Sequence, residues 1–487
     1  MSRSKHSLSH YNLLTCDMGQ LLPIGMVPVL PGDTIGHHTN LLIRVSPLAA
    51  PIMHQVDARV HHFYAPNRIL DDSTPNDAGT FNWESFITGG PDGMDTQQLP
   101  TLTTTGTPGD LFDYLGITQE AGIKVNALPI YMFNFTYNEW YRDEDLGVKR
   151  QLDDVTIPQC SWEKDYFTTA RPWAQKGPAV SIPVGQSAPV NADGAPGADI
   201  TTGNKNQSET TQYRMDASTA TLQTTGTPDG AGAQMYADLS QASGADPIDV
   251  RTAWGLQRFM ENAARYGSRY PEKMRQLGST YRGLMDRPEY LGGGTQPINF
   301  SEVLQTAPEA TGREFGVGDM YGHGIAAMRS NKYARTIGEH GIVMSFLSCR
   351  PKTVYMNGMH REFLRRDRED FHDPYLELVG QQEVWENELA GNAANQVGDV
   401  EKVFGYSDKY QEYRQQNSYV CGEYRGLLDY WHMGRDLLNP TLNQQFTDCN
   451  PTKRIYNEQT QNNLWIMAHH RIAAHRNIVA NPTARLT

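Results

Sequence analysis

The sequence lacks the features that mark several large classes of protein. Only five of its 487 residues are cysteines, and these are widely spaced, with no CxxC pair. This spacing argues against a disulfide framework and against a cysteine-based zinc site, and it favours a reducing compartment. No apolar run of about 18 residues occurs, so we expect no membrane span. The basic start of the chain is not followed by an apolar run, which argues against a signal peptide.

Positive charge is also scarce. The chain has 42 Lys and Arg against 55 Asp and Glu, which gives a formal net charge of −13. That balance argues against a protein whose whole surface grips nucleic acid, but it leaves room for a local basic patch. The glycine clusters at 292–294 and 316–318 do not complete a phosphate-binding loop, and no GxSxG or HExxH motif occurs. We therefore expect no enzyme activity, no catalytic residue and no cofactor.

Two groups of titratable residues could still carry chemistry. Histidines occur as the adjacent pairs His37-His38, His61-His62 and His469-His470. Adjacent residues on a strand face opposite sides, so a pair cannot easily share a metal ion. We expect no metal site and place these histidines at the surface or at a subunit interface. The acidic pair Glu369-Asp370 lies among four arginines, which favours an ion-pair network over an acid–base dyad. These arginines are Arg361, Arg365, Arg366 and Arg368.

The sequence does contain strand patterns over most of its length. Residues 56–64 and 41–46 alternate with a period of two, which is typical of strands with one buried face, and Pro47 and Pro51 separate them. A short strand and a turn are predicted at 27–34. Further strands are predicted at 129–137 and 341–350, and at 288–305, where a glycine hinge precedes the strand. Strands scattered in this way, with few long helices between them, favour an all-β sandwich or barrel with long inserted loops.

Three segments depart from the strand pattern. Residues 1–25 form a polar, weakly basic arm that is either disordered or draped over a partner. Residues 185–247 contain no Trp or Phe and are either disordered or a protruding insertion with a small core of its own; we favour the insertion. Residues 251–266 are the clearest helix, and we expect its stripe of Leu256, Phe259 and Met260 to pack against a core.

The basic bias of the chain lies at its end. Beyond residue 450 five Lys or Arg residues and three histidines face a single acid, Glu458. Trp465, Tyr456 and Phe446 lie close to these cations in the sequence. Single-stranded nucleic acid needs aromatic platforms for its bases and cations for its phosphates, so this segment is a candidate contact. A solvated tail is the alternative.

Several stretches, taken together and in order, resemble one known family. They are VPVLPGDT (27–34), ARVHHFYAPNRIL (58–70), YNEWYRDEDL (137–146), DYFTTARPWAQKGPAV (165–180), RPEYLGGGTQPINFSEVLQT (287–306), FGYSDKYQEYR (404–414) and GEYRGLLDYWHMGRDL (422–437). They resemble the major capsid proteins of the Microviridae, small icosahedral single-stranded DNA bacteriophages, and specifically the gokushovirus-like branch. The resemblance spans most of the chain.

The resemblance implies an eight-stranded antiparallel jelly roll of the viral capsid type, with long loop insertions and a few short helices. It implies a homo-oligomeric T=1 shell of sixty copies around a circular single-stranded DNA genome. The protein would lie in the virion, and in the host cytoplasm during assembly. Its other expected partners are the scaffolding, DNA pilot and small basic packaging proteins of the phage, and a bacterial host receptor.

On this basis the chain divides into four parts. They are the arm at 1–25, the first part of the jelly roll at 26–184, a surface insertion at 185–247 that forms a threefold protrusion, and a helix with the second part of the jelly roll and the C-terminal segment at 248–487. The host-contact candidates in the insertion are Tyr213, Met215 and Tyr236. The DNA-contact candidates are Arg3, Lys5, Arg471, Arg476 and Arg485.

One alternative comes from a different class of function. A carbohydrate-binding or carbohydrate-acting jelly-roll protein would use loop aromatics such as Trp83, Trp140 and Trp173, together with paired carboxylates. It would be a monomer or a small oligomer that binds glycans. The sequence offers no defined site for this activity.

Overall fold

The computed structural model describes residues 3–70, 81–88, 97–177, 200–201, 212–215, 222–225, 247–266, 287–304, 320–397 and 400–478. The chain forms two compact units. The first comprises Met1–Ala174 with Lys273–Thr487, and the second comprises Gln175–Glu272.

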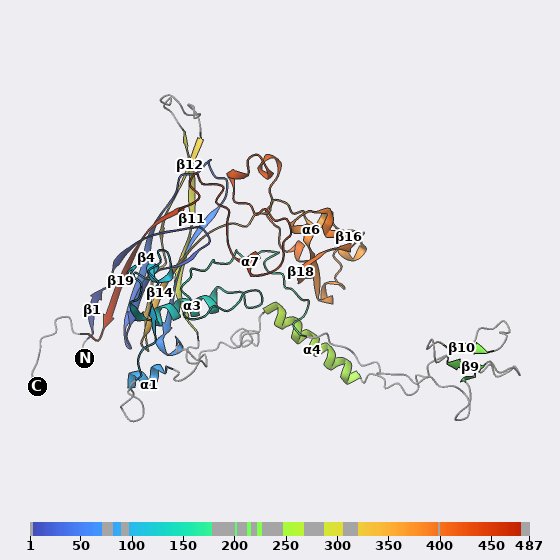
Figure 1. The fold of residues 1–487 in the computed structure, drawn as a ribbon, viewed down its shortest axis with the longest axis horizontal. Coiled ribbons are helices and arrows are strands. Elements are labelled where there is room, and N and C mark those ends of the chain that lie inside the picture. Colours follow the sequence, from blue (N-terminus) through green and yellow to red (C-terminus); the bar gives the residue numbers. More distant parts are fainter. Residues whose placement is uncertain are drawn as a thin grey trace, which may run out of the picture. The chain divides into compact units, whose positions relative to one another are not determined.

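The first unit is built around one curled antiparallel sheet, which has ten strands in the described part of the chain (Figure 1). The strand order is β1-β19-β4-β12-β11-β5-β14-β3, with β2 paired to β19 and β13 paired to β4. The strands are β1 (Ser4–Ser7), β2 (His10–Cys16), β3 (Leu21–Val29), β4 (Thr34–Val45), β5 (Val56–Pro66), β11 (Glu289–Leu304), β12 (Met320–Arg329), β13 (Tyr333–Thr336), β14 (Gly341–Pro351) and β19 (Leu464–Arg476). The fold is the all-β jelly roll predicted from the sequence.

Strand β11 joins the two halves of this sheet. Residues 289–298 pair with β5, and residues 299–304 pair with β12. We call β3, β14 and β5 the β14 wall, and β2, β19, β4 and β12 the β19 wall. Side chains from both walls share one hydrophobic core, so the two walls face each other. Examples are Ile24, Val60 and Leu347 from the β14 wall, and Ile43 and Ile466 from the β19 wall.

Side chains of the β19 wall bind the backbone of β3, an end strand of the described sheet. The Ile24 carbonyl accepts hydrogen bonds from the Asn12 side-chain amide at 2.9 Å and from the His470 ring at 2.8 Å. The Arg476 guanidinium donates to the Pro28 carbonyl. These bonds satisfy carbonyl groups that a free sheet edge would leave unpaired. They also show that residues 4–16, expected to belong to a disordered or partner-bound arm, form strands β1 and β2 paired with β19.

The opposite face of the β14 wall is covered by an insertion that carries helix α3 (Leu128–Trp140). Phe133 of α3 stacks on Phe346 of β14, with 5.4 Å between ring centroids. The predicted strand at 129–137 is therefore wrong. The segment is helical and buried on nearly every side, so it shows no amphipathic period, and its aromatic residues imitate a strand. Smaller elements of this insertion and its surroundings are α1 (Trp83–Thr88), α2 (Leu111–Tyr114), β6 (Thr101–Thr103) and β7 (Lys124–Asn126).

A further cluster of short elements lies between β14 and β19 in the sequence. It contains β15 (Gln381–Trp385), α6 (Glu386–Leu389), β16 (Gln396–Val397), β17 (Val400–Glu401), β18 (Val403–Asp408) and α7 (Gln444–Thr447). The predicted arginine network is found here. Arg361 contacts Glu388 at 3.1 Å and Arg365 contacts Glu412 at 3.2 Å, and these four side chains are buried. Arg365 also pairs with the nearby Glu362, so the network joins local acids with acids distant in the sequence.

The second unit contains helix α4 (Pro247–Tyr266) and a small sheet of β8 (Ile200–Thr201), β9 (Gln212–Met215) and β10 (Leu222–Thr225). The predicted helix is confirmed, but its apolar face is only partly buried: Ala264 is 1% exposed and Met260 is half-buried. Leu256 and Phe259 are 46% and 55% exposed. Periodicity reveals an apolar face but not what covers it. Most of 185–247, including Tyr236, lies outside the described residues, so the insertion stays a prediction.

The other predicted strands are found near their expected bounds. Residues 41–45 and 56–64 fall in β4 and β5, and 341–350 fall in β14. The glycines at 292–294 lie inside β11 and do not form a hinge before it. A Cβ on Gly293 would approach the Val60 carbonyl oxygen to 2.0 Å, so close backbone packing requires glycine there. In the described part of the chain no helix is long and apolar enough to cross a membrane.

Candidate nucleic-acid interface

The β19 wall has one uncovered face. Side chains of β19 alternate between buried and exposed along the strand, whereas those of β14 are buried almost throughout because α3 covers its second face. We call the uncovered side of the wall the outer face. It comprises Tyr11, Leu13 and Thr15 of β2, Trp465, Met467, His469 and Arg471 of β19, His38, Asn40, Leu42 and Arg44 of β4, and Ile325, Ala327 and Arg329 of β12.

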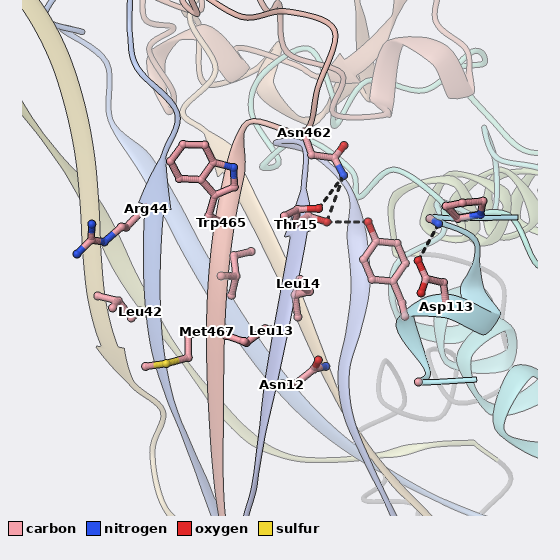
Figure 2. Close-up of a pocket in the computed structure, with 15 residues that line it drawn as sticks. Asn12, Leu13, Leu14, Thr15, Leu42, Arg44, Asp113, Asn462, Trp465 and Met467 are labelled. Carbon is pink, nitrogen blue, oxygen red and sulfur yellow. Dashed lines mark hydrogen bonds between the residues drawn. The ribbon is translucent and has the colours of Figure 1, made fainter. Parts of the chain in front are cut away.

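Strand register arranges these side chains in rows across the wall. Trp465 lies between Thr15 and Arg44, and Met467 lies between Leu13 and Leu42. The next rows place His469 between Tyr11 and Asn40, and Arg471 opposite His38. Directly opposed side chains on neighbouring strands lie within contact distance. Figure 2 shows Trp465 and Arg44 on neighbouring strands, with Met467 and Leu42 in the row beside them.

The outer face carries no negative charge of its own. Strands β2, β4, β12 and β19 contain no Asp or Glu, although the chain as a whole has a net charge of −13. Because no acid lies among them, the exposed cations of these strands add up to one positive electrostatic potential. The pKa of His38 is lowered, first by partial burial and then by the positive charges of Arg329, Arg471 and Lys332. The cations thus lie close enough to raise the local positive potential.

Aromatic and apolar side chains lie between these cations. Leu13 is 77% exposed, Tyr11 66% and Trp465 47%. Tyr11 stacks on His469 with 4.1 Å between ring centroids and 11° between ring planes. An exposed apolar patch with polar groups around it is typical of an interaction surface.

A groove of about 690 Å³ opens at the Trp465 end of the outer face (Figure 2). Its far side is formed by residues 108–116, and the Tyr114 hydroxyl is held there by a 2.7 Å bond to the Thr15 carbonyl. The Asn462 amide donates to the Thr15 hydroxyl at 3.2 Å. Asp113 is the acid on this rim, and its carboxylate accepts the N–H of Gly109 at 2.9 Å. The groove therefore combines an indole, a guanidinium, amide groups and one carboxylate.

The predicted DNA-contact residues fall in three different situations. Arg471 lies on the outer face, and Lys5 and Arg3 are exposed on and just before β1, next to β19. Arg476 instead forms a 3.0 Å ion pair with Asp33, whose side chain is only 1% exposed. Arg485 lies outside the described residues. The aromatic residues also separate, because Trp465 is exposed whereas Tyr456 and Phe446 are buried, so the last two cannot stack on bases.

The predicted host-contact residues cannot be compared with a site. Tyr213 and Met215 belong to β9, for which the structure describes the backbone alone, and Tyr236 lies outside the described residues. They remain predictions.

The histidine pairs divide between the two faces of the walls. His37, His62 and His470 are buried, so their expected surface or interface position is wrong, whereas His38 and His469 are partly exposed on the outer face. The His37 and His470 rings are 3.2 Å apart between Nε2 and Nδ1. Burial lowers the pKa of all three, to about 2 for His37, about 3 for His62 and about 4 for His470. Among the described residues, no group of three or more His, Cys, Asp or Glu is placed to hold a metal ion.

Sequence reasoning missed much of the outer face. Arg44, Arg329, Tyr11 and Leu13 lie far from the basic C-terminal segment in the sequence, and only strand pairing brings them to β19. The sequence did contain one sign of this face: residues 34–45, 320–329 and 464–476 all lack Asp and Glu although the chain as a whole is acidic. Using it requires knowing that these segments are neighbours.

Comparison with known proteins gives a consistent result. The family described as capsid protein (F protein) matches residues 1–485. Capsid protein VP1 of Bdellovibrio phage phiMH2K is 30% identical over 92% of this chain and 88% of its own length. Capsid protein VP1 of Chlamydia phage 1 is 29% identical, over 92% of this chain and 89% of its own. That of Spiroplasma virus 4 is 26% identical over 88% of this chain and 84% of its own.

Proposed function

Because the chain belongs to the capsid protein (F protein) family, a component of the virion, we propose that sixty copies assemble into a T=1 shell around a circular single-stranded DNA genome. The full-length match to capsid proteins of three phages supports this function over the carbohydrate-binding alternative. Assembly takes place in the host cytoplasm with scaffolding, DNA pilot and small basic packaging proteins. Contacts between copies each bury on the order of 1,000 Å² or more.

We propose that the outer face of the β19 wall looks into the shell and contacts the genome. The observation that carries this proposal is an exposed row of aromatic and cationic side chains on four strands without a single acid. Bases stack on Trp465 and Tyr11, while Arg44, Arg329 and Arg471 neutralise phosphates. Stacking of one base on an aromatic side chain contributes about 1–3 kcal/mol and tolerates any sequence, as a genome-wide contact requires.

The charge of the chain defines what else the shell needs. A subunit of net charge −13 cannot neutralise DNA overall. The outer face concentrates positive charge where the DNA lies, and the small basic packaging protein supplies the rest.

The genome contact is tested by removing its two components separately. Trp465→Ala removes the exposed indole, and the pair Arg44→Gln with Arg471→Gln removes two cations. We expect particles of normal size with less DNA per particle, measured by the ratio of absorbance at 260 and 280 nm and by sedimentation. The control is Arg368→Gln, an exposed arginine near Asp367 and Glu369 in another part of the fold. Normal DNA content in both test variants would refute the contact.

Host attachment is assigned to the insertion at 185–247. We propose that it forms the threefold protrusion and binds the bacterial receptor, with Tyr213, Met215 and Tyr236 as contact residues. Deletion of 185–247 should leave shells that form normally but adsorb poorly to host cells. Loss of assembly would show that the segment is structural.

A further inference from the structure

Two of the five cysteines lie directly opposite each other. The segments that contain them run antiparallel around a bridge between Ser161 and Asp448. Two backbone hydrogen bonds flank this bridge, and one of them runs from the Cys449 N–H to the Cys160 carbonyl at 2.7 Å. The register therefore places Cys160 next to Cys449, although the two are far apart in the sequence.

Both cysteines are free in the structure, and their register is compatible with a disulfide. Directly opposed residues of an antiparallel pair have Cα atoms about 4.5–5.5 Å apart, and disulfides join Cα atoms that are about 4.4–6.8 Å apart. The side chains of Cys160 and Cys449 interact directly with each other. Both are buried, at 2% and 0% exposure, so a small external disulfide reaches their sulfurs only through a local opening of these segments.

No other cysteine is directly opposed to a cysteine, although Cys349 lies close enough to Cys16 and to Cys160 for their charges to interact. Cys16 ends β2 and lies opposite Leu464, and Cys349 lies opposite Ala58 on β5. Cys421 is exposed and directly precedes a short 3-10 helix at Gly422–Arg425. Backbone register in the described residues thus selects a single cysteine pair.

We propose that Cys160 and Cys449 are reduced while the protein folds and assembles, and form an intrachain disulfide once it meets an oxidising medium. The oxidant is a small external disulfide. One protein thiolate attacks a sulfur of that disulfide and releases one small thiol, leaving a mixed disulfide on the protein. The second protein thiolate then attacks the protein-bound sulfur and releases the second small thiol. Two protein thiols are oxidised, the external disulfide is reduced, and the protons pass to the released thiolates.

The bond would fasten two separate parts of the fold. The Cys160 N–H donates to the Gly19 carbonyl at 2.7 Å, so this segment is already joined to the start of β3. Cys449 follows helix α7 and precedes β19. A covalent link would therefore tie the insertion that covers the β14 wall to the chain that enters the β19 wall. Because a disulfide stabilises by restricting the unfolded chain, a link between residues so distant in the sequence should be effective.

The test is oxidation of full-length native protein with oxidised glutathione, followed by alkylation of the remaining thiols and peptide mapping. We expect a linked pair of peptides containing Cys160 and Cys449, loss of two alkylated thiols per chain, and a melting temperature several degrees higher than that of the reduced protein. Cys449→Ala should lose both effects, and Cys421→Ser should keep both.

Mapping the wild-type protein decides the proposal even if Cys449→Ala does not fold. Five alkylated thiols after prolonged oxidation of the folded protein would overturn it. So would a bond that joins Cys160 to Cys349 or Cys16, because the backbone register would then not have selected the partner.

Discussion

At the scale of single residues, two arginines of the same strand have opposite roles. Arg471 is exposed on the outer face of β19, whereas Arg476 pairs with the buried carboxylate of Asp33 and donates to the Pro28 carbonyl. The sequence presents both as equal members of one basic segment. Position relative to the core, and not residue type, decides which one is free to meet DNA.

This difference predicts unequal effects on stability. Arg476→Gln leaves the Asp33 carboxylate buried without its cation, which typically costs about 3–5 kcal/mol. Arg471→Gln removes an exposed charge and should change the free energy of unfolding by less than about 0.5 kcal/mol. Urea denaturation of the two purified variants measures both values. Equal small losses would show that the Asp33 pair does not stabilise the fold.

The buried histidines give the protein a predicted sensitivity to acid. His37, His62 and His470 contact one another and the hydroxyl groups of Thr39, Ser330 and Ser345. In the described part of the chain, none of their hydrogen-bond partners is a carboxylate that could stabilise a protonated ring. The fold therefore holds these three rings neutral.

Stability should fall as the pH drops below about 6.5. Above that value the rings are neutral in both states and the full stability is present. Below it the unfolded chain binds protons that the folded chain, with histidine pKa values of about 2 to 4, cannot bind. Each histidine then removes about 1.4 kcal/mol per pH unit until its folded pKa is reached.

The measurement is the urea midpoint between pH 7.5 and pH 5. His62→Gln can keep a hydrogen bond to Ser345. It should reduce the slope of unfolding free energy against pH by the contribution of one histidine, about 1.4 kcal/mol per pH unit. The matched control is His323→Gln at an exposed position of β12, which should leave the slope unchanged. A midpoint that does not depend on pH in the wild-type protein would contradict the buried cluster.

At the scale of elements, alternation predicted the half-buried strand β4, and a short apolar run predicted the fully buried strand β14, but the fully buried helix α3 was mistaken for a strand. Residues 41–45 alternate because one side of β4 meets the core and the other is uncovered. Helix α3 is buried nearly all round, so neither period is visible in its sequence, and it imitates a strand. Strands β1 and β2 were expected to be disordered or draped over a partner, because the sequence does not show that β19 pairs with them.

The close approach of β11 to β5 gives a prediction about a single glycine. In Gly293→Ala the new methyl group would meet the Val60 carbonyl at 2.0 Å, and the backbone would have to move. We expect a loss of about 1–3 kcal/mol in the free energy of unfolding, the range typical of overpacking. Gly338→Ala, where nothing lies within 4 Å, is the control and should be nearly neutral. Equal effects would mean that β11 and β5 do not pack this tightly.

At the scale of the whole molecule, the sequence carried the class of fold and the family but not the interface. Family motifs lie in contiguous stretches and can be recognised without coordinates. The outer face is assembled from four strands spread between residues 10 and 476, so its charge and its aromatic rows exist only after pairing. The outer face is positively charged although the whole chain has a net charge of −13, and this difference arises only when the chain folds.

The most direct test of the proposed function is a cryo-electron microscopy reconstruction of the DNA-filled particle. We predict sixty subunits with the outer face of the β19 wall lining the lumen, and additional density of nucleotide size above Trp465 and Arg44. A particle in which that face points outward, or is covered by a neighbouring subunit, would contradict the account.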